Sequence, residues 1–420
     1  MKQQATALDV FYGTERIGTV HDTAPLSFEY ARTWLDRAHV FPLSVIALQA
    51  GRIASPQVQA FFENLLPEGD LRITLAEQRK ASTLFALLRE VAGDTVGAFV
   101  LLPIGQKPVA PAYEPTTWDS LANIVRTQSA AAIQTQGKNN NSRISLAGAQ
   151  DKASIAIFDG KTPLLPKGSA PSTHILKPDI RRLHKVRESA ANEAITMRTA
   201  AYCGLSTAKV FYERLTHACI VERFDRFTHA DGTLGRLIQV DFCQIAGTDS
   251  EKKYEKEGGP GVAQCAQIIR RYSSRAAPDL QAFAQWIFFN IYVGNNDSHA
   301  KNLSIHERPG EGARLTPFYD LMCTRIYPGL SKEFAFNIGG TVLPGKIGKA
   351  ELQGLATQIG MGARYLQSVA LALAAKIPAA IDKATQDIAP ELSSSGQTFA
   401  NKLALEVKAM TKRAAARIAA

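Results

Sequence analysis

The stretch Asn296-Asp297-Ser298-His299-Ala300-Lys301-Asn302 follows a strongly apolar segment, residues 279–293, and it decides how the rest of the chain is interpreted. The carboxylate of Asp297 stands five positions before the amide of Asn302. A protein-kinase catalytic loop uses this spacing to hold a substrate hydroxyl and a metal ion beside the same γ-phosphate. A further acid, Asp320, lies about twenty residues downstream, where such an enzyme needs its other magnesium ligand. The spacing predicts a phosphotransferase.

Asp297 and Asp320 each have a structural alternative to this interpretation. Asp and Asn side chains often hydrogen-bond the turns in which they lie, so both acids could be turn residues. The offset from Asp297 to Asn302 favours catalysis, because a base for the incoming hydroxyl and a metal ligand must flank the same phosphate. His299 and Lys301 either stabilise phosphate charge or brace the loop, and the residues alone leave both roles open.

Length and composition bound the class of protein. The chain has 420 residues, more than one hydrophobic core usually serves, so we expect two or three packed units. The N-terminus lacks the apolar core of a signal peptide, and no stretch approaches the roughly 18 apolar residues of a membrane span, so we expect a cytoplasmic protein without a membrane partner. Five scattered cysteines without a Cys-x-x-Cys pair predict reduced thiols. A net charge of +10 favours acidic partners but does not distinguish nucleotide, protein and DNA.

Residues 1–105 are predicted to form a small α+β unit. A hairpin is expected at residues 8–20, where two β-rich runs flank a Gly-containing turn. Apolar residues at helical spacing predict helices at 58–66 and 83–91, and a short apolar run predicts a strand at 96–102.

A connector and a candidate phosphate loop follow this unit. Prolines mark a linker at residues 106–142, which ends in a polar stretch, 136–142, that is expected to be mobile. Two strand-like pieces within residues 143–157 are then separated by small side chains, so backbone N–H groups at the tip could approach phosphate oxygens. Most turns of this kind are only turns, so the loop by itself is a weak indication.

Lys177 ends a short strand that is predicted at residues 172–178. Kinases carry at this place the lysine that pairs with the α- and β-phosphates of ATP. Glu193, in the helix predicted at residues 188–201, could orient Lys177. A solvated acid on a helix face is an equally good alternative for Glu193.

Two further strands are predicted at residues 218–226 and 237–243. Between two lobes, such a segment commonly offers backbone groups to the adenine edge of a nucleotide. One motif is rejected: residues 340–347 resemble a P-loop, but Ile347 stands where Ser or Thr must ligate magnesium, and Pro344 removes one amide. We interpret that segment as a turn. The apolar segment 279–293 predicts a buried helix that holds the following loop rigidly.

Several motifs occur in the same order as in one known family. They are Ser145 to Lys152 (Ser-Leu-Ala-Gly-Ala-Gln-Asp-Lys), Thr173 to Lys177, Val221 to Arg226, Gly258 to Gly261, Asp297 to Asn302 and Pro317 to Asp320. Together they closely resemble the HipA family, the serine/threonine kinase toxins of bacterial toxin–antitoxin modules. With the N-terminal unit, the resemblance covers nearly the whole chain.

The resemblance implies an α+β fold, namely a protein-kinase-like, two-lobed fold with an N-terminal α+β subdomain and a mostly helical C-terminal lobe. The implied domains are a HipA-type subdomain at 1–105, a linker and polar loop at 106–142, a kinase N-lobe-like region with phosphate loop and hinge at 143–245, and a helical C-lobe with the catalytic loop and metal-binding Asp at 246–420.

The resemblance also implies a role for each site residue. The catalytic residues would be Asp297, His299 and Lys301, with Asn302 and Asp320 as ligands of Mg²⁺. The ATP-binding residues would be Leu146, Ala147, Gly148, Ala149, Gln150, Asp151, Lys152, Lys177, Val240, Asp241 and Phe242. Ser145 falls where the family autophosphorylates its own phosphate loop. Val240 departs from the acidic residue of the family's hinge, which removes a side-chain acceptor there but leaves the backbone groups.

The implied partners are a HipB-like helix-turn-helix antitoxin, operator DNA bound through the antitoxin complex, and a protein target such as an aminoacyl-tRNA synthetase. Two alternatives stay open. A small-molecule phosphotransferase could share the same layout of acids, and a non-catalytic chain could serve only as corepressor of an antitoxin. Residues 401–420 carry five basic side chains and one acidic one, which could meet DNA phosphates, although a solvated helix face is the preferred interpretation.

Overall fold

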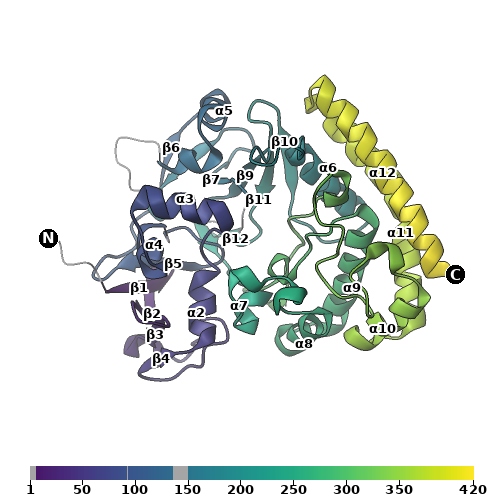
Figure 1. The fold of residues 1–420 in the computed structure, drawn as a ribbon. Coiled ribbons are helices and arrows are strands. Elements are labelled where there is room, and N and C mark those ends of the chain that lie inside the picture. Colours follow the sequence, from purple (N-terminus) through teal and green to yellow (C-terminus); the bar gives the residue numbers. More distant parts are fainter. Residues whose placement is uncertain (1–5, 92, 136–149) are drawn as a thin grey trace. The chain divides into compact units, whose positions relative to one another are not determined.

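The computed structural model describes residues 6–91, 93–135 and 150–420, and Figure 1 shows the order of the elements along the chain. The chain divides into two compact units. Unit 1 comprises Met1–Ile175 and Asp225–Glu251, and unit 2 comprises Leu176–Phe224 and Lys252–Ala420. The sequence predicted boundaries after residues 142 and 245 instead. No local pattern in the sequence predicts that the segment Asp225–Glu251 belongs to unit 1.

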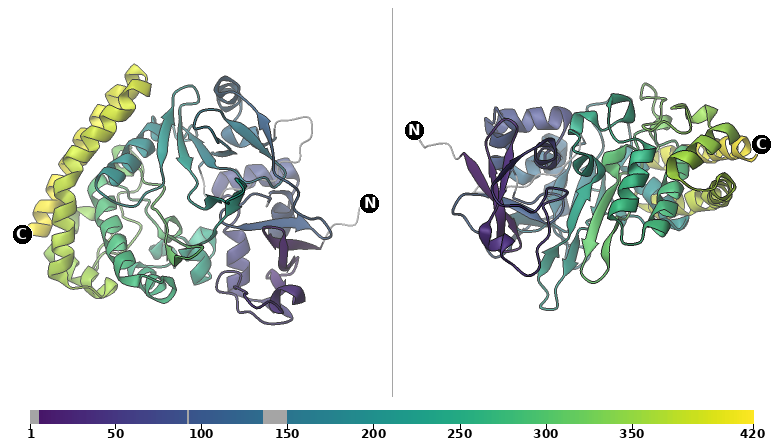
Figure 2. Two further views of the ribbon diagram at one scale, coloured as in Figure 1. Left: turned by 180° about the vertical axis from the view of Figure 1, so that it is seen from behind. Right: turned by 90° about the horizontal axis from the view of Figure 1, so that it is seen from below.

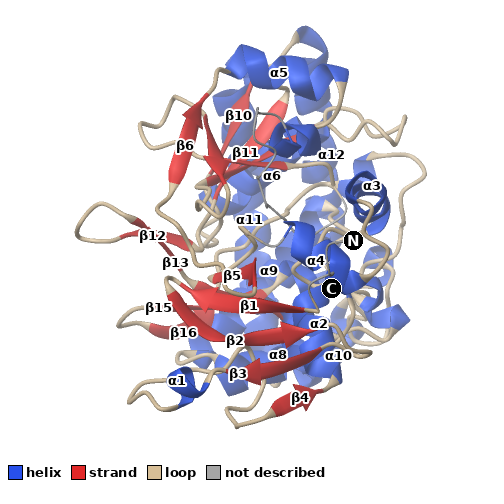
Figure 3. Ribbon diagram, turned by 90° about the vertical axis from the view of Figure 1, so that its left-hand side faces the viewer, coloured by secondary structure: helices blue, strands red, loops and turns tan. Residues whose placement is uncertain are grey.

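Unit 1 begins with a five-stranded antiparallel sheet, drawn in red in Figure 3. Its strands are β1 (Ala7–Tyr12), β2 (Glu15–His21), β3 (Ser27–Tyr30), β4 (Arg52–Ala54) and β5 (Phe99–Pro103), in the order β4-β3-β2-β1-β5. The predicted hairpin is confirmed, because β1 pairs with β2 across a turn at Gly13, where φ is +58°. Such a φ favours glycine, which has no Cβ to clash with the backbone.

Short helices accompany this sheet. They are α1 (Arg32–Leu35), α2 (Pro56–Glu63), α3 (Gly69–Arg79) and α4 (Leu84–Val91). Two of them, α2 and α4, confirm the helices predicted from apolar spacing. The start of α2 follows from its sequence, because the side chain of Ser55 accepts a hydrogen bond from the backbone N–H of Val58 and Pro56 stands in the first turn. Phe28, Phe61 and Phe99 lie in the shared core.

The segment predicted to be a linker, residues 106–142, contains regular structure in its described part. Strand β6 (Ala112–Pro115) pairs antiparallel with β8 (Leu164–Lys167), and helix α5 (Trp118–Thr127) follows β6. Prolines flank or end these elements instead of interrupting them, so the linker interpretation was wrong there. The polar stretch at 136–142 lies outside the described residues.

One of the remaining strands of unit 1 is shorter than the sequence predicts. They are β7 (Ala153–Ile155), the start of β9 (His174–Pro178), β12 (Arg226–Thr228), β13 (Leu234–Arg236) and β14 (Ile238–Asp241). The strand predicted at 237–243 ends at Asp241, where helix α7 (Phe242–Ala246) begins. Asp241 accepts a hydrogen bond from the N–H of Gln244, and the Gln244 side chain accepts one from the N–H of Asp241. This capping box favours a helix over further strand.

A buried ion-pair network ties the segments of unit 1 together. Asp94 is fully buried and accepts hydrogen bonds from the N–H and hydroxyl of Ser172, at 3.1 and 2.8 Å. Its other carboxylate oxygen accepts from Arg226 at 2.8 Å and from Arg236 at 3.0 Å. Arg226 also contacts Asp225 at 3.0 Å. The network explains why residues 225–251 belong to unit 1.

We expect Asp94→Ala to lower the free energy of unfolding by about 3–5 kcal/mol, because it leaves the buried Arg226 with too little compensating charge. Urea denaturation followed by circular dichroism measures the change. The control is Asp22→Ala, which removes an exposed carboxylate of the same unit and should shift stability by less than about 0.5 kcal/mol. Equal losses for the two variants would contradict a role for the network.

Unit 2 is mostly helical. Its helices are α6 (Ser189–Tyr202), α8 (Val262–Tyr272), α9 (Ala276–Val293), α10 (Lys349–Ile359), α11 (Ala363–Ile388) and α12 (Ser394–Ala419). The two longest, α11 and α12, lie side by side, as Figures 1 and 2 show, and both pack on α6 and α9. Its strands are the end of β9, β10 (Val210–Glu213), β11 (Ala218–Glu222), β15 (Ser304–Arg308) and β16 (Gly312–Leu315).

Helix α9 is the core of unit 2, as its apolar sequence predicts. Phe283, Trp286, Phe289 and Tyr292 are completely buried in it, so nearly every face of the helix meets other protein. All five cysteines are free and buried, in agreement with the prediction of reduced thiols. Among the residues that the structure describes, none of the helices combines the length and the apolar composition needed to cross a membrane.

Candidate active site

The candidate catalytic loop starts where α9 ends, at Gly294. Gly294 has a φ of +73°, and a Cβ at this position would lie 2.9 Å from the Met410 side chain. The positive φ favours glycine here, and a side chain would in addition displace the end of the Met410 side chain. The loop thus begins directly at the end of the buried helix α9.

Hydrogen bonds within the loop fix its path. The N–H and side-chain amide of Asn295 donate to the backbone oxygen and side-chain oxygen of Asn290, at 2.9 and 2.8 Å. The hydroxyl of Ser298 donates to the carbonyl of Asn295 at 3.1 Å. Asn302 Nδ2 donates to the carbonyl of Asp297 at 3.2 Å. The structure therefore brings together the two residues whose spacing predicted the site.

Asp297 is the exposed residue of an otherwise buried loop. Asn296, Ser298 and His299 on either side of it are at most 5 % exposed. Its carboxylate Oδ1 accepts a hydrogen bond from the hydroxyl of Tyr254, and the Tyr254 ring meets the His299 ring edge-on at 5.2 Å. The loop thus presents one carboxylate to incoming groups and already holds a hydroxyl on it.

Glu255 holds Tyr254 in this place. Its carboxylate accepts a hydrogen bond from the N–H of Asn337 at 2.7 Å. A Cβ at Gly261 would lie 2.4 Å from Glu255 Oε1, so a larger residue there would have to displace this carboxylate. Burial raises the pKa of Glu255. The short segment before α8 is therefore anchored next to the catalytic loop.

Lys177, Glu193 and Asp320 form a second cluster. Lys177 Nζ donates to Glu193 Oε1 at 2.6 Å and to Asp320 Oδ1 at 2.8 Å. Burial by itself lowers the pKa of Lys177, but the carboxylates of Asp320 and Glu193 outweigh it and raise the pKa. The Glu193 side chain is 2 % exposed, whereas that of Asp320 is 43 % exposed. Glu193 therefore orients Lys177, and the alternative of a solvated helix-face acid is excluded.

The backbone around Asp320 is held firmly by α6. Asp320 itself has a φ of +59°, which is uncommon for a residue with a side chain. Asn192 in α6 accepts from the N–H of Cys323 and donates to its carbonyl, each at 2.9 Å, and it donates to the Tyr327 hydroxyl at 3.0 Å. Such a conformation persists when its surroundings determine it, and it commonly marks a functional site.

Residues on both sides of Asp320 also contact the catalytic loop directly. The hydroxyl of Tyr319 donates to the carbonyl of Lys301 at 2.9 Å. The N–H of Asn296 donates to the hydroxyl of Thr324 at 2.8 Å. The cluster around Lys177 and the loop around Asp297 are therefore parts of one assembled site.

Comparison with known proteins identifies the family. The family model described as the HipA N-terminal domain matches residues 8–102, and that described as the HipA-like C-terminal domain matches residues 144–383. This chain belongs to the HipA family. It is 38% identical to the protein Y4mE of Sinorhizobium fredii over 347 residues, which are 80% of this chain and 81% of that protein. The family predicted from the motifs is confirmed.

Two comparisons with HipA of Shewanella oneidensis bear on function and fold. The serine/threonine-protein kinase toxin HipA of Shewanella oneidensis is 30% identical over 391 residues, 89% of this chain and 87% of that protein. The solved structure of Shewanella oneidensis HipA with HipB and operator DNA matches with a TM-score of 0.82 and 28% identity over 97% of each chain. The predicted mixed α+β fold, with an N-terminal sheet and a helical C-terminal part, is thus the HipA fold.

The donor set of this HipA-family chain fits magnesium. In the described part of the chain, no group of three or more His, Cys, Asp or Glu side chains could hold a metal by itself. Asp320 offers a carboxylate, and Asn302 offers its amide oxygen because Nδ2 is the donor in its bond to Asp297. Magnesium prefers oxygen ligands and usually takes only one or two carboxylates, completing its shell with waters and substrate phosphates. Asn302 and Asp320 as metal ligands stay predictions.

The other predicted ATP contacts lie in unit 1 or outside the described residues. Ser145, Leu146, Ala147, Gly148 and Ala149 belong to the part of the chain that the structure does not describe. Gln150 and Lys152 are half-buried in unit 1. Asp151 accepts hydrogen bonds from the N–H groups of Ala130 and Ala131, at 2.7 and 3.0 Å. Its carboxylate therefore serves as an anchor for the neighbouring 3-10 helix.

The predicted hinge residues of the HipA-family chain also lie in unit 1. Val240 and Phe242 are buried, and the Asp241 side chain caps α7. The Asp241 carboxylate is thus engaged with its own helix, which leaves backbone groups as the means by which this segment would meet an adenine. Contacts of these three residues with ATP stay predictions.

Sequence reasoning missed three residues that build the site. Tyr254 stands among charged residues with no motif of its own, and Asn192 is one of several polar residues in α6. Tyr319 lies within the motif Pro317 to Asp320, but its side chain was assigned no role. The signal for Tyr319 was its place next to a predicted metal ligand, whereas the other two become visible only through contacts with distant segments.

Proposed function

We propose that this chain is a protein kinase that transfers the γ-phosphate of ATP to a serine or threonine hydroxyl of another protein. One observation carries the proposal: the exposed carboxylate of Asp297 accepts a hydrogen bond from a hydroxyl group, in a loop that contacts the Lys177 and Asp320 cluster. A general base must make this contact with the hydroxyl that it deprotonates. The relative named as a serine/threonine-protein kinase toxin supports a protein substrate.

In the proposed mechanism, each cluster has its own task. Lys177, oriented by Glu193, would bind phosphate oxygens, and Asp320 and Asn302 would hold Mg²⁺, whose charge would offset that of the phosphates. Asp297 accepts the proton of the substrate hydroxyl and aligns that oxygen with the phosphorus. Positioning and charge compensation supply most of the rate, because the chain's own residues form no covalent intermediate.

His299 and Lys301 are proposed to brace the loop. The two residues are 5 % and 6 % exposed. The His299 ring packs against Tyr254, and the carbonyl of Lys301 accepts from Tyr319. Contacts of this kind favour bracing over direct stabilisation of phosphate charge, the two roles that the sequence left open.

The regulation and partners of the chain are proposed from its relatives. We infer that a HipB-like helix-turn-helix antitoxin neutralises the chain and carries it to operator DNA, because the solved Shewanella complex holds HipA, HipB and operator DNA together. Autophosphorylation of Ser145 would add about 1.5–2 negative charges beside the triphosphate site and shut it down. A translation enzyme such as an aminoacyl-tRNA synthetase is the proposed target.

Purified protein incubated with γ-labelled ATP, Mg²⁺ and a cell lysate tests this function. We expect label in at least one protein band, in phosphoserine or phosphothreonine, and mass spectrometry of the chain itself should find phosphate on Ser145. Label transferred only to metabolites would select the small-molecule phosphotransferase. No transfer at all, with intact operator binding together with the antitoxin, would select the non-catalytic corepressor.

Tyr254 occupies the acceptor oxygen that the substrate hydroxyl needs, so Tyr254→Phe should lower the KM for the protein substrate by up to about tenfold. Hydrogen bonds to a charged group contribute on the order of 1.5–3 kcal/mol, of which the substrate must replace a part. Steady-state kinetics on the phosphorylated target would measure the change, and the affinity for ATP should stay the same.

The matched control is Tyr272→Phe, which removes a phenolic hydroxyl of the same unit at the end of α8. It should leave both constants unchanged. If Tyr254→Phe instead lowered kcat at constant KM, Tyr254 would be a residue that orients Asp297 during transfer, and its proposed competition with the substrate would be wrong.

A further inference from the structure

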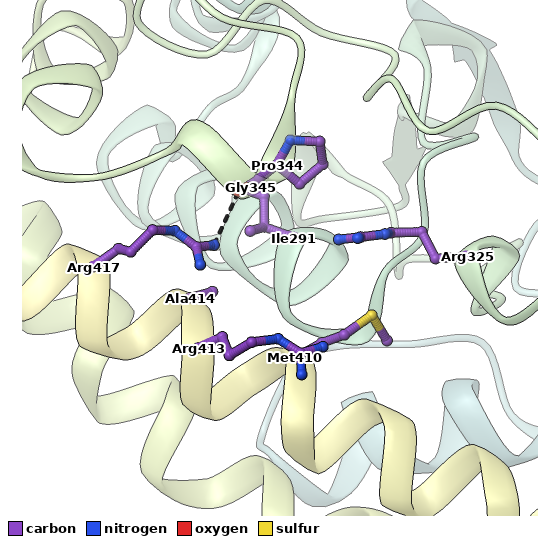
Figure 4. A pocket seen from close by; sticks show the side chains of 8 residues that line it. All are labelled: Ile291, Arg325, Pro344, Gly345, Met410, Arg413, Ala414 and Arg417. Atoms are coloured by element: carbon purple, nitrogen blue, oxygen red, sulfur yellow. Dashed lines mark hydrogen bonds between the residues drawn. The ribbon is translucent and has the colours of Figure 1, made fainter.

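A pocket of about 60 Å³ lies in unit 2 beneath the start of the catalytic loop. Its lining comes from α9, the segment after Cys323, a 3-10 turn at Pro344–Lys346, and α12. The residues that line it are Ile291, Arg325, Pro344, Gly345, Met410, Arg413, Ala414 and Arg417 (Figure 4). Part of this wall is the segment that resembles a P-loop in sequence, which the proposed ATP site does not use.

Three guanidinium groups are directed toward the space of this pocket, those of Arg325, Arg413 and Arg417 (Figure 4). Backbone oxygens hold Arg417 in place, because Nη2 donates to the carbonyl of Pro344 at 3.0 Å and Nε donates to that of Ile347 at 3.3 Å. Across residues 6–91, 93–135 and 150–420, no carboxylate forms an ion pair with any of the three arginines. Arg325 and Arg413 are exposed residues, whereas Arg417 is half-buried.

Electrostatics supports an anion in this position. Burial lowers the pKa of Arg417, and the charges of Arg325 and Arg413 lower it further. Three like charges around one small space repel one another, and an anion between them would turn that repulsion into attraction. Guanidinium groups also match phosphate oxygens with paired N–H donors.

We propose that this three-arginine pocket is a binding site for a phosphate dianion, either inorganic phosphate or the terminal phosphate of a small phosphomonoester. The pocket is small, at about 60 Å³, and it can take in a group of the size of a phosphoryl group. A phosphomonoester carries about −1.5 to −2 charges at neutral pH, which matches three converging arginines.

A duplex DNA backbone is a poorer match for the pocket. Each of its phosphates is a diester that carries one negative charge, and the phosphates follow one another in a row along the duplex. The three-arginine pocket instead places three arginines around one small space. We therefore assign the pocket to a small dianion and treat DNA as the competing outcome of the test.

The pocket adjoins the candidate catalytic loop. The backbone N–H of Arg325 donates to the carbonyl of Gly294 at 3.0 Å, and the hydroxyl of Thr324 donates to the same oxygen at 3.2 Å. Met410 also lies against Gly294. An occupant of the pocket thus binds next to the residue at which the loop leaves α9. The binding itself does not depend on the proposed kinase activity.

Isothermal titration calorimetry of the full chain with inorganic phosphate and with phenyl phosphate tests the proposal. Arg413→Gln and Arg325→Gln should each weaken binding of a dianion by at least about tenfold, since each removes a charge-assisted hydrogen bond. The matched control is Lys412→Gln, which removes the same charge from an exposed neighbour on α12 that does not line the pocket. It should change the affinity by less than about twofold, because its side chain makes no contact with an anion in the pocket and its charge acts only through screening solvent. Circular dichroism confirms that each variant is folded.

The two probes distinguish the sources of the dianion. Tighter binding of phenyl phosphate would identify a phosphomonoester, and tighter binding of inorganic phosphate would identify the free ion; either result supports the site. Equal affinities in the wild type, both arginine variants and the control would overturn it. The proposal would also be overturned if the two arginine variants bound the dianion like the wild type but weakened the binding of the antitoxin complex to operator DNA. The pocket would then be a DNA contact.

Discussion

Asp297→Asn should reduce the rate of γ-phosphate transfer by about 10²–10⁴-fold, the range over which a positioned general base acts. The two side chains have nearly the same size, but the amide cannot accept a proton at neutral pH. Asp297 is exposed, and its backbone carbonyl, which binds Asn302, is not altered. We therefore expect the fold and the affinity for ATP to persist while transfer is lost.

Single-turnover transfer and calorimetric titration with ATP separate the two quantities. Glu257→Gln is the matched control, since it neutralises an exposed carboxylate in the segment that carries Tyr254. It should transfer phosphate at the wild-type rate. Undiminished transfer by Asp297→Asn would remove Asp297 from the mechanism, whereas loss of ATP binding by the same variant would show that it does more than accept a proton.

Lys177→Met should lower the free energy of unfolding by about 3–5 kcal/mol, because it leaves the carboxylate of Glu193 buried and without its cation. It should also weaken ATP binding, since the phosphates lose their ammonium partner. Urea denaturation measures the first effect. The control Lys209→Met breaks a pair between side chains that are 81% and 47% exposed, and such pairs contribute little.

The loss in Lys177→Met should depend on pH with a defined sign. In the wild type, the pKa of Lys177 is raised above its ordinary value, so the lysine stays protonated in both the folded and the unfolded chain between pH 5 and 8. In the variant, burial raises the folded-state pKa of Glu193, so the folded chain binds more protons than the unfolded chain. The variant should therefore lose stability as the pH rises from 5 to 8.

A second variant separates pairing from packing. Lys177→Met combined with Glu193→Leu removes both charges and should recover much of the lost stability while ATP binding stays weak. If the double variant were as unstable as Lys177→Met alone, the loss would come from packing around the lysine and not from the unpaired carboxylate.

Local patterns in the sequence determined much of the fold and part of the site. The alternation of residues 8–20, the apolar segment that became α9, and the offset from Asp297 to Asn302 are signals between near neighbours, which propensity and spacing can report. The order of six short motifs then identified the HipA family, and the spacing of the acids predicted a catalytic role for Asp297 and a metal-binding role for Asp320. The strand before Lys177 and the helix that carries Glu193 also follow from such signals.

Tertiary structure alone decided which distant groups meet. No local pattern places the hydroxyl of Tyr254 on Asp297, brings Asp94 to Arg226, or gathers Arg325 with the arginines of α12. Each of these contacts joins segments that are far apart in the chain, and its free energy arises only when burial removes the competing water. The spacing of residues along the chain determines the helices and strands. Ion pairs and hydrogen bonds between these elements depend on how they pack, which the spacing does not determine.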